Sequence, residues 1–265
     1  MSVRDQFAWV ARRALRRVGF SQVAPLPSLE SFAKEVDAEA MRRSAQGDMA
    51  RLFYGHQGRL ANKWDHYLPI YERHMGRFRK QREQPVRLLE LGVSHGGSLQ
   101  LWRTYFGPTA RIFGVDVNPL CRAVDDADLC VRIGSQADPE FLTRVVGEME
   151  GVDIVVDDAS HVATHQRISF QTLFPLLGPG GIYIAEDLHT SYWYSYGGGL
   201  GRQGSFIEEM KHLIDDIHVS FSQARPRFPE IYRTVESIHF YDSIVVIEKG
   251  PESEHFHTKV GRPSF

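Results

Sequence analysis

The stretch Val86-Arg-Leu-Leu-Glu-Leu-Gly-Val-Ser-His-Gly-Gly97 decides the fold. Its apolar first half is typical of a buried strand, and its glycine-rich second half leads into a helical pattern from Ser98 to Phe106. Strands that alternate with helices indicate βαβ units and a parallel sheet. Further strands are predicted at 111–117, 129–133, 152–156 and 181–185, and further helices at 138–149 and 168–177.

The last part of the chain follows a different pattern. A helix is predicted at 206–217, and two strands follow at 234–240 and 243–248, separated only by Tyr241 and Asp242. Such a short connection allows an antiparallel hairpin but no crossover. A parallel α/β sheet closed by an antiparallel pair is the usual architecture of class I methyltransferases, so we predict that Rossmann-like fold.

The chain is predicted to have three segments. These are a helical N-terminal extension at 1–84, the α/β domain at 85–250 and a polar tail at 251–265. Pro69 is expected to kink or restart a helix within 60–72. An amphipathic helix near the N-terminus would dock on the protein or lie on a membrane surface; its apolar residues are Phe7, Trp9, Val10, Leu15 and Val18.

Composition excludes several classes of protein. Of 265 residues, 42% are hydrophobic and 24% charged, which excludes a disordered chain. The 31 basic residues do not exceed the 33 acidic ones, so we expect no nucleic acid partner. No apolar stretch approaches the roughly 20 residues of a membrane span. Arginines interrupt the apolar residues near the N-terminus, so no signal peptide is predicted. Two cysteines favour a reducing compartment, and we predict a cytoplasmic protein.

The turn after the first strand predicts a binding site for S-adenosylmethionine. Ligands of such sheets bind at the carboxyl ends of the strands, where Gly92, Gly96 and Gly97 permit close approach. The spacing G-x-x-x-G-G departs from the dinucleotide pattern G-x-G-x-x-G. Glu90 would repel a pyrophosphate and suits a cationic ligand. An NAD-dependent oxidoreductase is therefore the alternative, not the first choice.

Other residues complete the expected cofactor site. Asp116 ends the second strand and is expected to accept hydrogen bonds from two ribose hydroxyls. Gln136 or Asp138 would contact the adenine edge, although Asp138 before Pro139 is equally the pattern of a helix N-cap. The remaining expected contacts are Ser98, Asp157 and Tyr67. With its neighbours Lys63, Trp64 and His66, Tyr67 either closes over the cofactor or packs on the core.

Four carboxylates follow the fourth and fifth strands. They belong to Asp157-Asp158 and Glu186-Asp187, and parallel strands should bring them to one edge of the sheet. Like charges packed together need a neutralising partner. Oxygen ligands favour a hard divalent ion, so Mg²⁺ or Mn²⁺ is predicted.

A histidine stands three residues after Asp158. The imidazole of His161 is expected to act as general base, because its reference pKa of about 6.5 suits proton transfer at neutral pH. His165 and His189 are rival bases. Metal-assisted deprotonation of a hydroxyl, followed by attack on the methyl group, is the predicted chemistry.

At this point the chain resembles the metal-dependent sugar O-methyltransferases of macrolide biosynthesis, in particular the mycinamicin 2''-O-methyltransferase type. Related cephalosporin-modifying and mycobacterial sugar methyltransferases share the core. The resemblance covers roughly residues 60 to 250 and rests on four motifs: HYLPIYERH (66–74), LLELGVSHGGSLQLW (88–102), DDASH (157–161) and AEDLHTSYW (185–193). It implies that Asp158, Glu186 and Asp187 hold Mg²⁺ and that His161 is the base.

The resemblance also implies the type of substrate and the assembly. The acceptor would be a sugar hydroxyl of a glycoside in natural product biosynthesis, and the enzyme would form a homo-oligomer. The aromatic and glycine-rich loop at 190–199 is expected to line the acceptor pocket, since aromatic rings stack on sugars. A non-catalytic S-adenosylmethionine-binding subunit is a further alternative.

Overall fold

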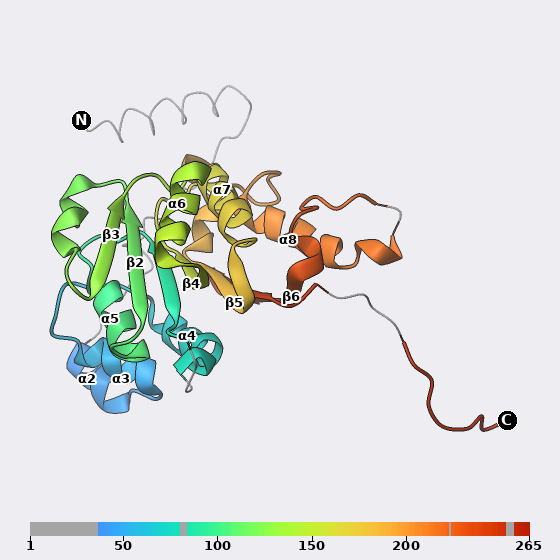
Figure 1. The fold of residues 1–265 in the computed structure, drawn as a ribbon, viewed down its shortest axis with the longest axis horizontal. Helices are drawn as coiled ribbons and strands as arrows, with labels where there is room; N and C mark the ends of the chain where they lie inside the picture. Colours follow the sequence, from blue (N-terminus) through green and yellow to red (C-terminus); the bar gives the residue numbers. More distant parts are fainter. Residues whose placement is uncertain (1–36, 80–83, 223, 253–256) are drawn as a thin grey trace, which may run out of the picture. The chain divides into compact units, whose positions relative to one another are not determined.

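The computed structural model describes residues 37–79, 84–222, 224–252 and 257–265. The predicted amphipathic helix within residues 7–18 lies outside the described residues. Contacts between Cα atoms divide the chain after Asp37, and residues 38–265 form one compact unit. That unit contains a single seven-stranded sheet with helices on both faces (Figure 1).

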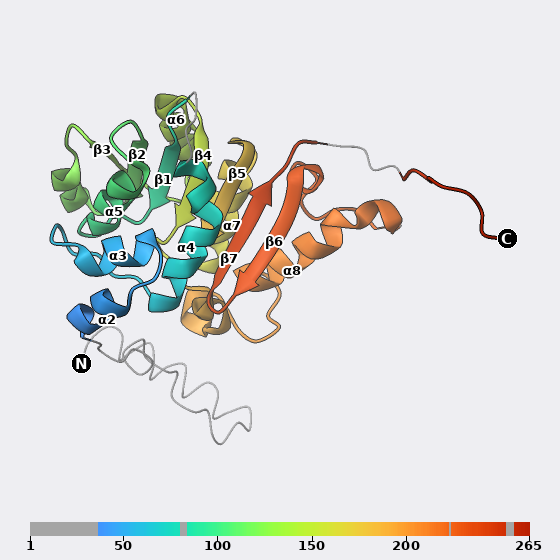
Figure 2. The ribbon, with the colours of Figure 1, turned by 90° about the horizontal axis from the view of Figure 1, so that it is seen from below.

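The sheet has the strand order β3-β2-β1-β4-β5-β7-β6. The first five strands pair in parallel, whereas β7 lies antiparallel between β5 and β6. Figure 2 shows β6 and β7 side by side at one end of the sheet. The predicted class I methyltransferase architecture is therefore confirmed. The strands are β1 (Arg87–Leu91), β2 (Arg111–Asp116), β3 (Leu129–Ile133), β4 (Val152–Asp157), β5 (Leu177–Ala185), β6 (Val235–Tyr241) and β7 (Ile244–Lys249).

Helices cover the sheet in two groups. The α-helices in the described residues are α2 (Ala38–Ser44), α3 (Asp48–Gly55), α4 (Leu68–Met75), α5 (Gly97–Phe106), α6 (Pro139–Met149), α7 (Ala163–Leu173) and α8 (Phe206–Ile217). Apolar residues of α3, α4 and α5 share one core cluster, and those of α6, α7 and α8 share the other. Adjacent residues of β1 point to opposite faces, so Leu88 joins the first cluster and Leu89 the second.

Two predicted elements need correction. The helix predicted at 168–177 is instead α7, which begins five residues earlier, and Leu177 already pairs with Val152 as the first residue of β5. The stretch 60–72 is not one helix, because residues 60–64 are irregular and a 3₁₀ turn at Asp65–Tyr67 precedes α4. Pro69 lies in the first turn of α4, where its missing N–H has no partner to lose.

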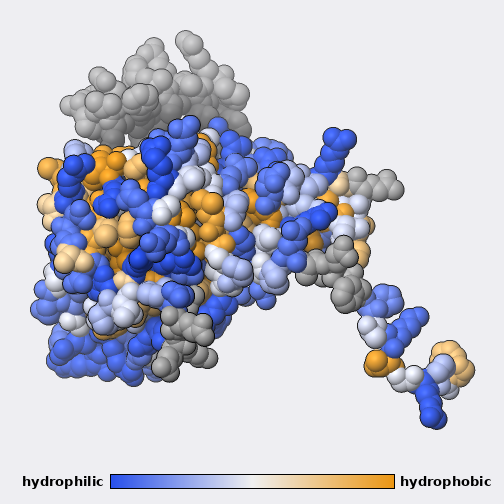
Figure 3. Space-filling view, in the orientation of Figure 1, coloured by the Kyte–Doolittle hydropathy of each residue, from blue (hydrophilic) through white to orange (hydrophobic). Residues whose placement is uncertain are grey.

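Hydrophilic residues cover much of the face drawn in Figure 3, with hydrophobic residues between them. Within the part of the chain that the structure describes, no helix combines the length and apolar character needed to cross a bilayer.

Candidate active site at the carboxyl ends of the strands

Strands β1, β4 and β5 bring the predicted acids to one edge of the sheet. Leu91 pairs with Asp157, and Asp157 pairs with Ala185, so the three strands end side by side. Gly92 has a φ of +96°, and a Cβ at this position would lie 2.1 Å from the backbone oxygen of Asp158. A glycine is required here because the chain after β1 passes directly against the chain after β4.

A buried lysine joins three of the acids. The Nζ atom of Lys63 lies 2.6 Å from Asp158, 2.9 Å from Glu186 and 3.4 Å from Glu90, and its side chain is 3% exposed. Burial opposes the charged ammonium, but the neighbouring carboxylates raise the pKa of Lys63 well above its ordinary value. The lysine therefore places a positive charge among the carboxylates of Glu90, Asp158, Glu186 and Asp187, which together are called the acidic cluster.

Residues of the same N-terminal segment bind the other carboxylate oxygens. The indole Nε1 of Trp64 and the hydroxyl of Tyr67 donate to Oδ1 of Asp187 at 3.1 and 3.0 Å. The hydroxyl of Tyr71 donates to Oε1 of Glu186 at 2.6 Å. Burial, with the charge of Asp158, raises the pKa of Glu186 well above its ordinary value. Each of the three predicted metal ligands thus contacts at least one side chain of residues 63–71 directly.

His161 faces two of these acids. Its Nε2 atom lies 3.8 Å from Asp158 and 3.7 Å from Asp187, and these three residues form a group whose ligand atoms lie within 4.8 Å of one another. His161 and Asp187 have positive φ values of 56° and 55°, which are costly for residues other than glycine and recur at functional sites. The buried Nδ1 of His161 has no hydrogen-bond partner in the described residues.

The rival histidines make other contacts. Nδ1 of His165 lies 2.9 Å from the hydroxyl of Ser160, outside the acidic group. Nδ1 of His189 lies 2.5 Å from the hydroxyl of Ser243, and burial lowers the pKa of His189. Of the three imidazoles, only that of His161 belongs to the Asp158–Asp187 group.

Glu90 and Ser98 lie together beneath the glycine turn. The carboxylate of Glu90 is fully buried and accepts a hydrogen bond of 2.7 Å from the hydroxyl of Ser98. Burial raises the pKa of Glu90, although Lys63 and Ser98 oppose the rise. A buried carboxylate of this kind favours a cationic neighbour.

Asp116 holds the glycine turn in place. Its Oδ2 atom accepts hydrogen bonds from the backbone N–H groups of Val93 and Ser94, and Oδ1 accepts one from Asn118. Partial burial acts against ionisation, but these three donors outweigh it and lower the pKa of Asp116. Gly96 follows the turn with a φ of +81° and caps α5. Asp116 and the turn therefore meet where the cofactor was predicted.

Gln136 and Asp157 form a buried network behind the turn. Gln136 donates to Asp157 at 3.0 Å and accepts from the backbone N–H of Ser160 at 2.8 Å. Asp157 also accepts from Ser169 and Tyr183, and burial raises its pKa. These contacts brace the loop that carries Asp158 and His161. A contact of Gln136 or Asp157 with the cofactor stays a prediction, as it does for Tyr67.

Asp138 has the capping role that was its alternative. Its side chain accepts a hydrogen bond of 3.0 Å from the backbone N–H of Phe141, with Pro139 as the first residue of α6. The aromatic loop packs on His189, whose ring centroid lies 4.9 Å from that of Trp193 and 6.1 Å from that of Trp64, the residue that donates to Asp187. Tyr194 of this loop is 68% exposed and available to a ligand.

Two parts of this site were not predicted from the sequence. The location of Lys63 between the acids follows from contacts that span 95 and 123 residues, for which the sequence carries no local signal. The hydrogen bond from Tyr71 to Glu186 spans 115 residues. Tyr67 packs in the first core cluster and Trp64 against it, and with Lys63 they also direct polar atoms into the acidic cluster. Closure of this segment over the cofactor stays a prediction.

Comparison with known proteins identifies relatives that match most of the chain. No family model matches the chain. The chain is 37% identical over 260 residues to the 8-demethyl-8-(2-methoxy-alpha-L-rhamnosyl)-tetracenomycin-C 3'-O-methyltransferase of Streptomyces olivaceus, covering 93% of this chain and 64% of that protein. It is 38% identical over 200 residues to the mycinamicin VI 2''-O-methyltransferase of Micromonospora griseorubida, covering 71% of this chain and 49% of that protein. The chain thus spans less than two thirds of the length of these relatives.

Solved structures agree with the sequence relatives. MycE, a methyltransferase of the mycinamycin biosynthetic pathway solved with Mg and SAH, superposes with a TM-score of 0.69 at 33% identity, covering 80% of this chain and 56% of MycE. A further MycE structure, with Mg, SAH and mycinamycin VI, gives a TM-score of 0.64 at 31% identity, covering 96% of this chain and 65% of MycE. The sequence and structural relatives of this chain are thus macrolide and tetracenomycin sugar O-methyltransferases.

Proposed function

We propose that this chain transfers the methyl group of S-adenosylmethionine to a sugar hydroxyl of a natural-product glycoside in a reaction that requires Mg²⁺. The observation that carries the proposal is the convergence of the acids on Asp158, which shares Lys63 with Glu186 and Glu90 and faces His161 together with Asp187. The relatives support it, since each is named an O-methyltransferase of a sugar-bearing compound and MycE binds Mg and SAH.

The donor set fits a hard divalent ion. Asp158, Glu186 and Asp187 would supply only carboxylate oxygens, the ligands that Mg²⁺ or Mn²⁺ prefers. The cluster already holds the positive charge of Lys63, as expected where several buried acids need neutralisation. When bound, the ion would lower the pKa of a nearby hydroxyl.

His161 would hold the proton that leaves the acceptor hydroxyl. Its Nε2 atom lies 3.8 Å from Asp158 and 3.7 Å from Asp187, and these carboxylates would orient the imidazole toward the acceptor. Glu90 would attract the ammonium of S-adenosylmethionine, and Asp116 would accept from its ribose hydroxyls. The aromatic loop around Trp193 would position the sugar and exclude water.

A glycoside panel tests the proposal. The protein is incubated with S-adenosylmethionine, Mg²⁺ and rhamnosides or other glycosides, and mass spectrometry is used to find products that have gained one methyl group. We expect methylation that EDTA abolishes and Mg²⁺ restores. Full turnover in EDTA would refute the role of the metal. Reduction of NAD⁺ with a glycoside would favour the oxidoreductase instead.

Two histidine variants separate the base from its rival. We expect His161→Gln to bind S-adenosylmethionine with unchanged affinity and to lose about 10²–10⁴-fold in kcat. His165→Gln is the matched control, because His165 contacts Ser160 rather than the acids. Loss of turnover in His165→Gln with retention in His161→Gln would overturn the assignment. Tight cofactor binding without methylation of any glycoside would favour a non-catalytic subunit.

A further inference from the structure

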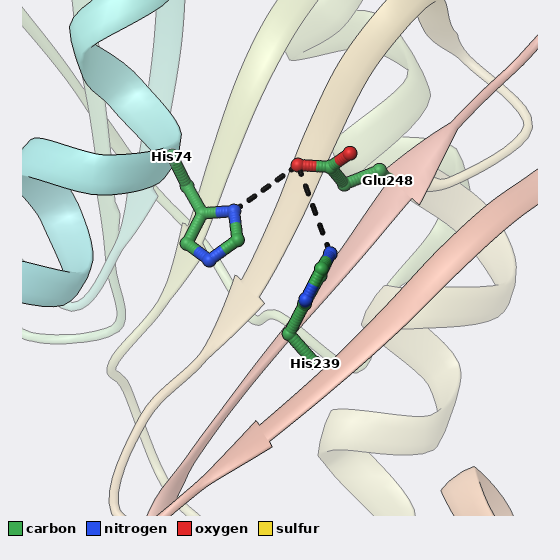
Figure 4. A group of neighbouring side chains, drawn as sticks. All are labelled: His74, His239 and Glu248. Carbon is green, nitrogen blue, oxygen red and sulfur yellow. Dashed lines mark hydrogen bonds and ion pairs between the residues drawn. The ribbon is translucent and has the colours of Figure 1, made fainter.

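A second group of possible metal ligands lies away from the acidic cluster. Figure 4 shows His74 of α4, His239 of β6 and Glu248 of β7 directed toward one another. Oε1 of Glu248 lies 3.1 Å from Nδ1 of His74 and 4.0 Å from Nε2 of His239. The two imidazole centroids are 4.6 Å apart, so helix α4 and the distant hairpin of β6 and β7 converge on one point.

The surrounding residues hold the group in place. His74 is 4% exposed, and its Nε2 atom lies 2.8 Å from the hydroxyl of Tyr241. When that hydroxyl binds Nε2, the Nδ1 atom of His74 faces Glu248. A partner on the second nitrogen is the usual way in which a metal-binding histidine is oriented. Nε2 of His239, the atom that faces Glu248, also lies 2.9 Å from the hydroxyl of Ser237, which a bound ion would displace.

The charges around the group are mixed. Nη1 of Arg77 lies 3.4 Å from the same oxygen of Glu248 and competes with a bound cation. The Arg77 side chain is 42% exposed, so it can turn toward solvent at small cost. Burial and the neighbouring His239 lower the pKa of His74, despite its hydrogen bond with Glu248, which favours the neutral form that binds metals.

We propose that His74, His239 and Glu248 form a second metal site, selective for a transition metal ion of the Zn²⁺ class. Two imidazole nitrogens and one carboxylate oxygen are typical zinc ligands, with solvent in the fourth position. Tetrahedral ligands at about 2.0–2.1 Å from the ion lie about 3.3 Å apart. The His74–Glu248 distance already matches, and His239, 38% exposed on an edge strand, needs to approach Glu248 by about 0.7 Å.

The site would act as a clip between α4 and the edge hairpin. Helix α4 carries Tyr71, whose hydroxyl binds Glu186 in the acidic cluster. An ion that fixes α4 to β6 and β7 would stabilise this wall of the active site without touching the reacting groups. The proposal rests on this geometry alone and does not depend on the methyltransferase reaction.

Metal titration tests the site with the whole 265-residue chain. The chain is stripped with a chelator, saturated with Mg²⁺ to occupy the acidic cluster, and titrated with Zn²⁺ and Co²⁺. We expect one Zn²⁺ per chain by elemental analysis after gel filtration, a higher thermal midpoint, and a visible Co²⁺ spectrum of nitrogen ligands in tetrahedral geometry. No retained Zn²⁺ and no change of midpoint would overturn the proposal.

Variants locate the bound ion. His239→Ala, at an exposed position that tolerates substitution, should weaken Zn²⁺ binding at least tenfold, and the matched control His212→Ala, at a similarly exposed histidine, should not. Glu248→Gln should have the same effect as His239→Ala. Asp158→Asn should keep the Zn²⁺. Loss of the ion in Asp158→Asn, with retention in His239→Ala, would assign Zn²⁺ to the acidic cluster and refute the second site.

Discussion

Replacement of Lys63 by methionine tests how the acidic cluster is neutralised. The ammonium of Lys63 touches the same carboxylates, Asp158 and Glu186, that we propose as Mg²⁺ ligands. At an effective dielectric constant of about 20, contacts of 2.6 and 2.9 Å are each worth about 6 kcal/mol before desolvation. Removing one partner of such a buried group leaves a net loss of about 3–5 kcal/mol.

Two opposite effects are therefore expected from Lys63→Met. Without Mg²⁺, the thermal midpoint should fall by about 6–20 °C, at about 2–4 °C per kcal/mol for a domain of this size. The affinity for Mg²⁺ should rise about tenfold or more, because the competing cation is gone. Binding of the ion at 100 times its dissociation constant would restore about 2.7 kcal/mol of stability.

The assay is thermal unfolding of wild type and variant over a Mg²⁺ titration, with calorimetry for the affinity. Lys63→Arg is the control, since it retains a positive charge and should retain low Mg²⁺ affinity. An equal loss of stability at all Mg²⁺ concentrations, with unchanged affinity, would mean that the lysine and the ion do not share oxygens. The reasoning would then be wrong.

Three further outcomes follow from single contacts. Tyr71→Phe removes the hydrogen bond to Glu186 and should lower the free energy of unfolding in urea by about 1.5–3 kcal/mol. Gly92→Ala introduces a Cβ at positive φ against the Asp158 backbone and should cost about 2–5 kcal/mol in the same assay, with weaker Mg²⁺ binding. Burial lowers the pKa of His74, so the unfolded chain binds the proton first, and the free energy of unfolding should fall as pH falls below about 6.5. His74→Gln should flatten that slope, and an unchanged slope would contradict this explanation.

Strand patterns in the sequence were enough to predict the architecture. The strand predicted at 129–133 has the observed bounds, and the two-residue gap after residue 240 correctly indicated a hairpin. Parallel strands end at the same edge of a sheet, so the motifs at Asp158 and Glu186 were expected to meet there. These predictions succeed because local periodicity and sheet topology decide them together.

Features set by distant packing were not predictable in this way. The start of α7 was missed because Ala163 to Arg167 include polar residues on the outer face of the helix. Strand β5 begins at Leu177 because this residue pairs with Val152 of the neighbouring strand, and no local sequence pattern indicates that pairing. The same holds for Gln136, whose bracing contacts with Asp157 and Ser160 cover more than 20 residues of sequence.

Residues 63–71 of the N-terminal segment form part of the candidate active site. The domain boundary predicted at residue 84 stays a prediction. Hydrogen bonds and ion pairs that cross this boundary bind the carboxylates at the ends of the strands. Lys63 supplies the charge, while Trp64, Tyr67 and Tyr71 supply donors. Buried carboxylates without these partners would be costly, because each would lose both a counter-charge and hydrogen bonds. The strands of the sheet therefore place the acids, and residues 63–71 supply the cation and the hydrogen-bond donors that offset the cost of burying them.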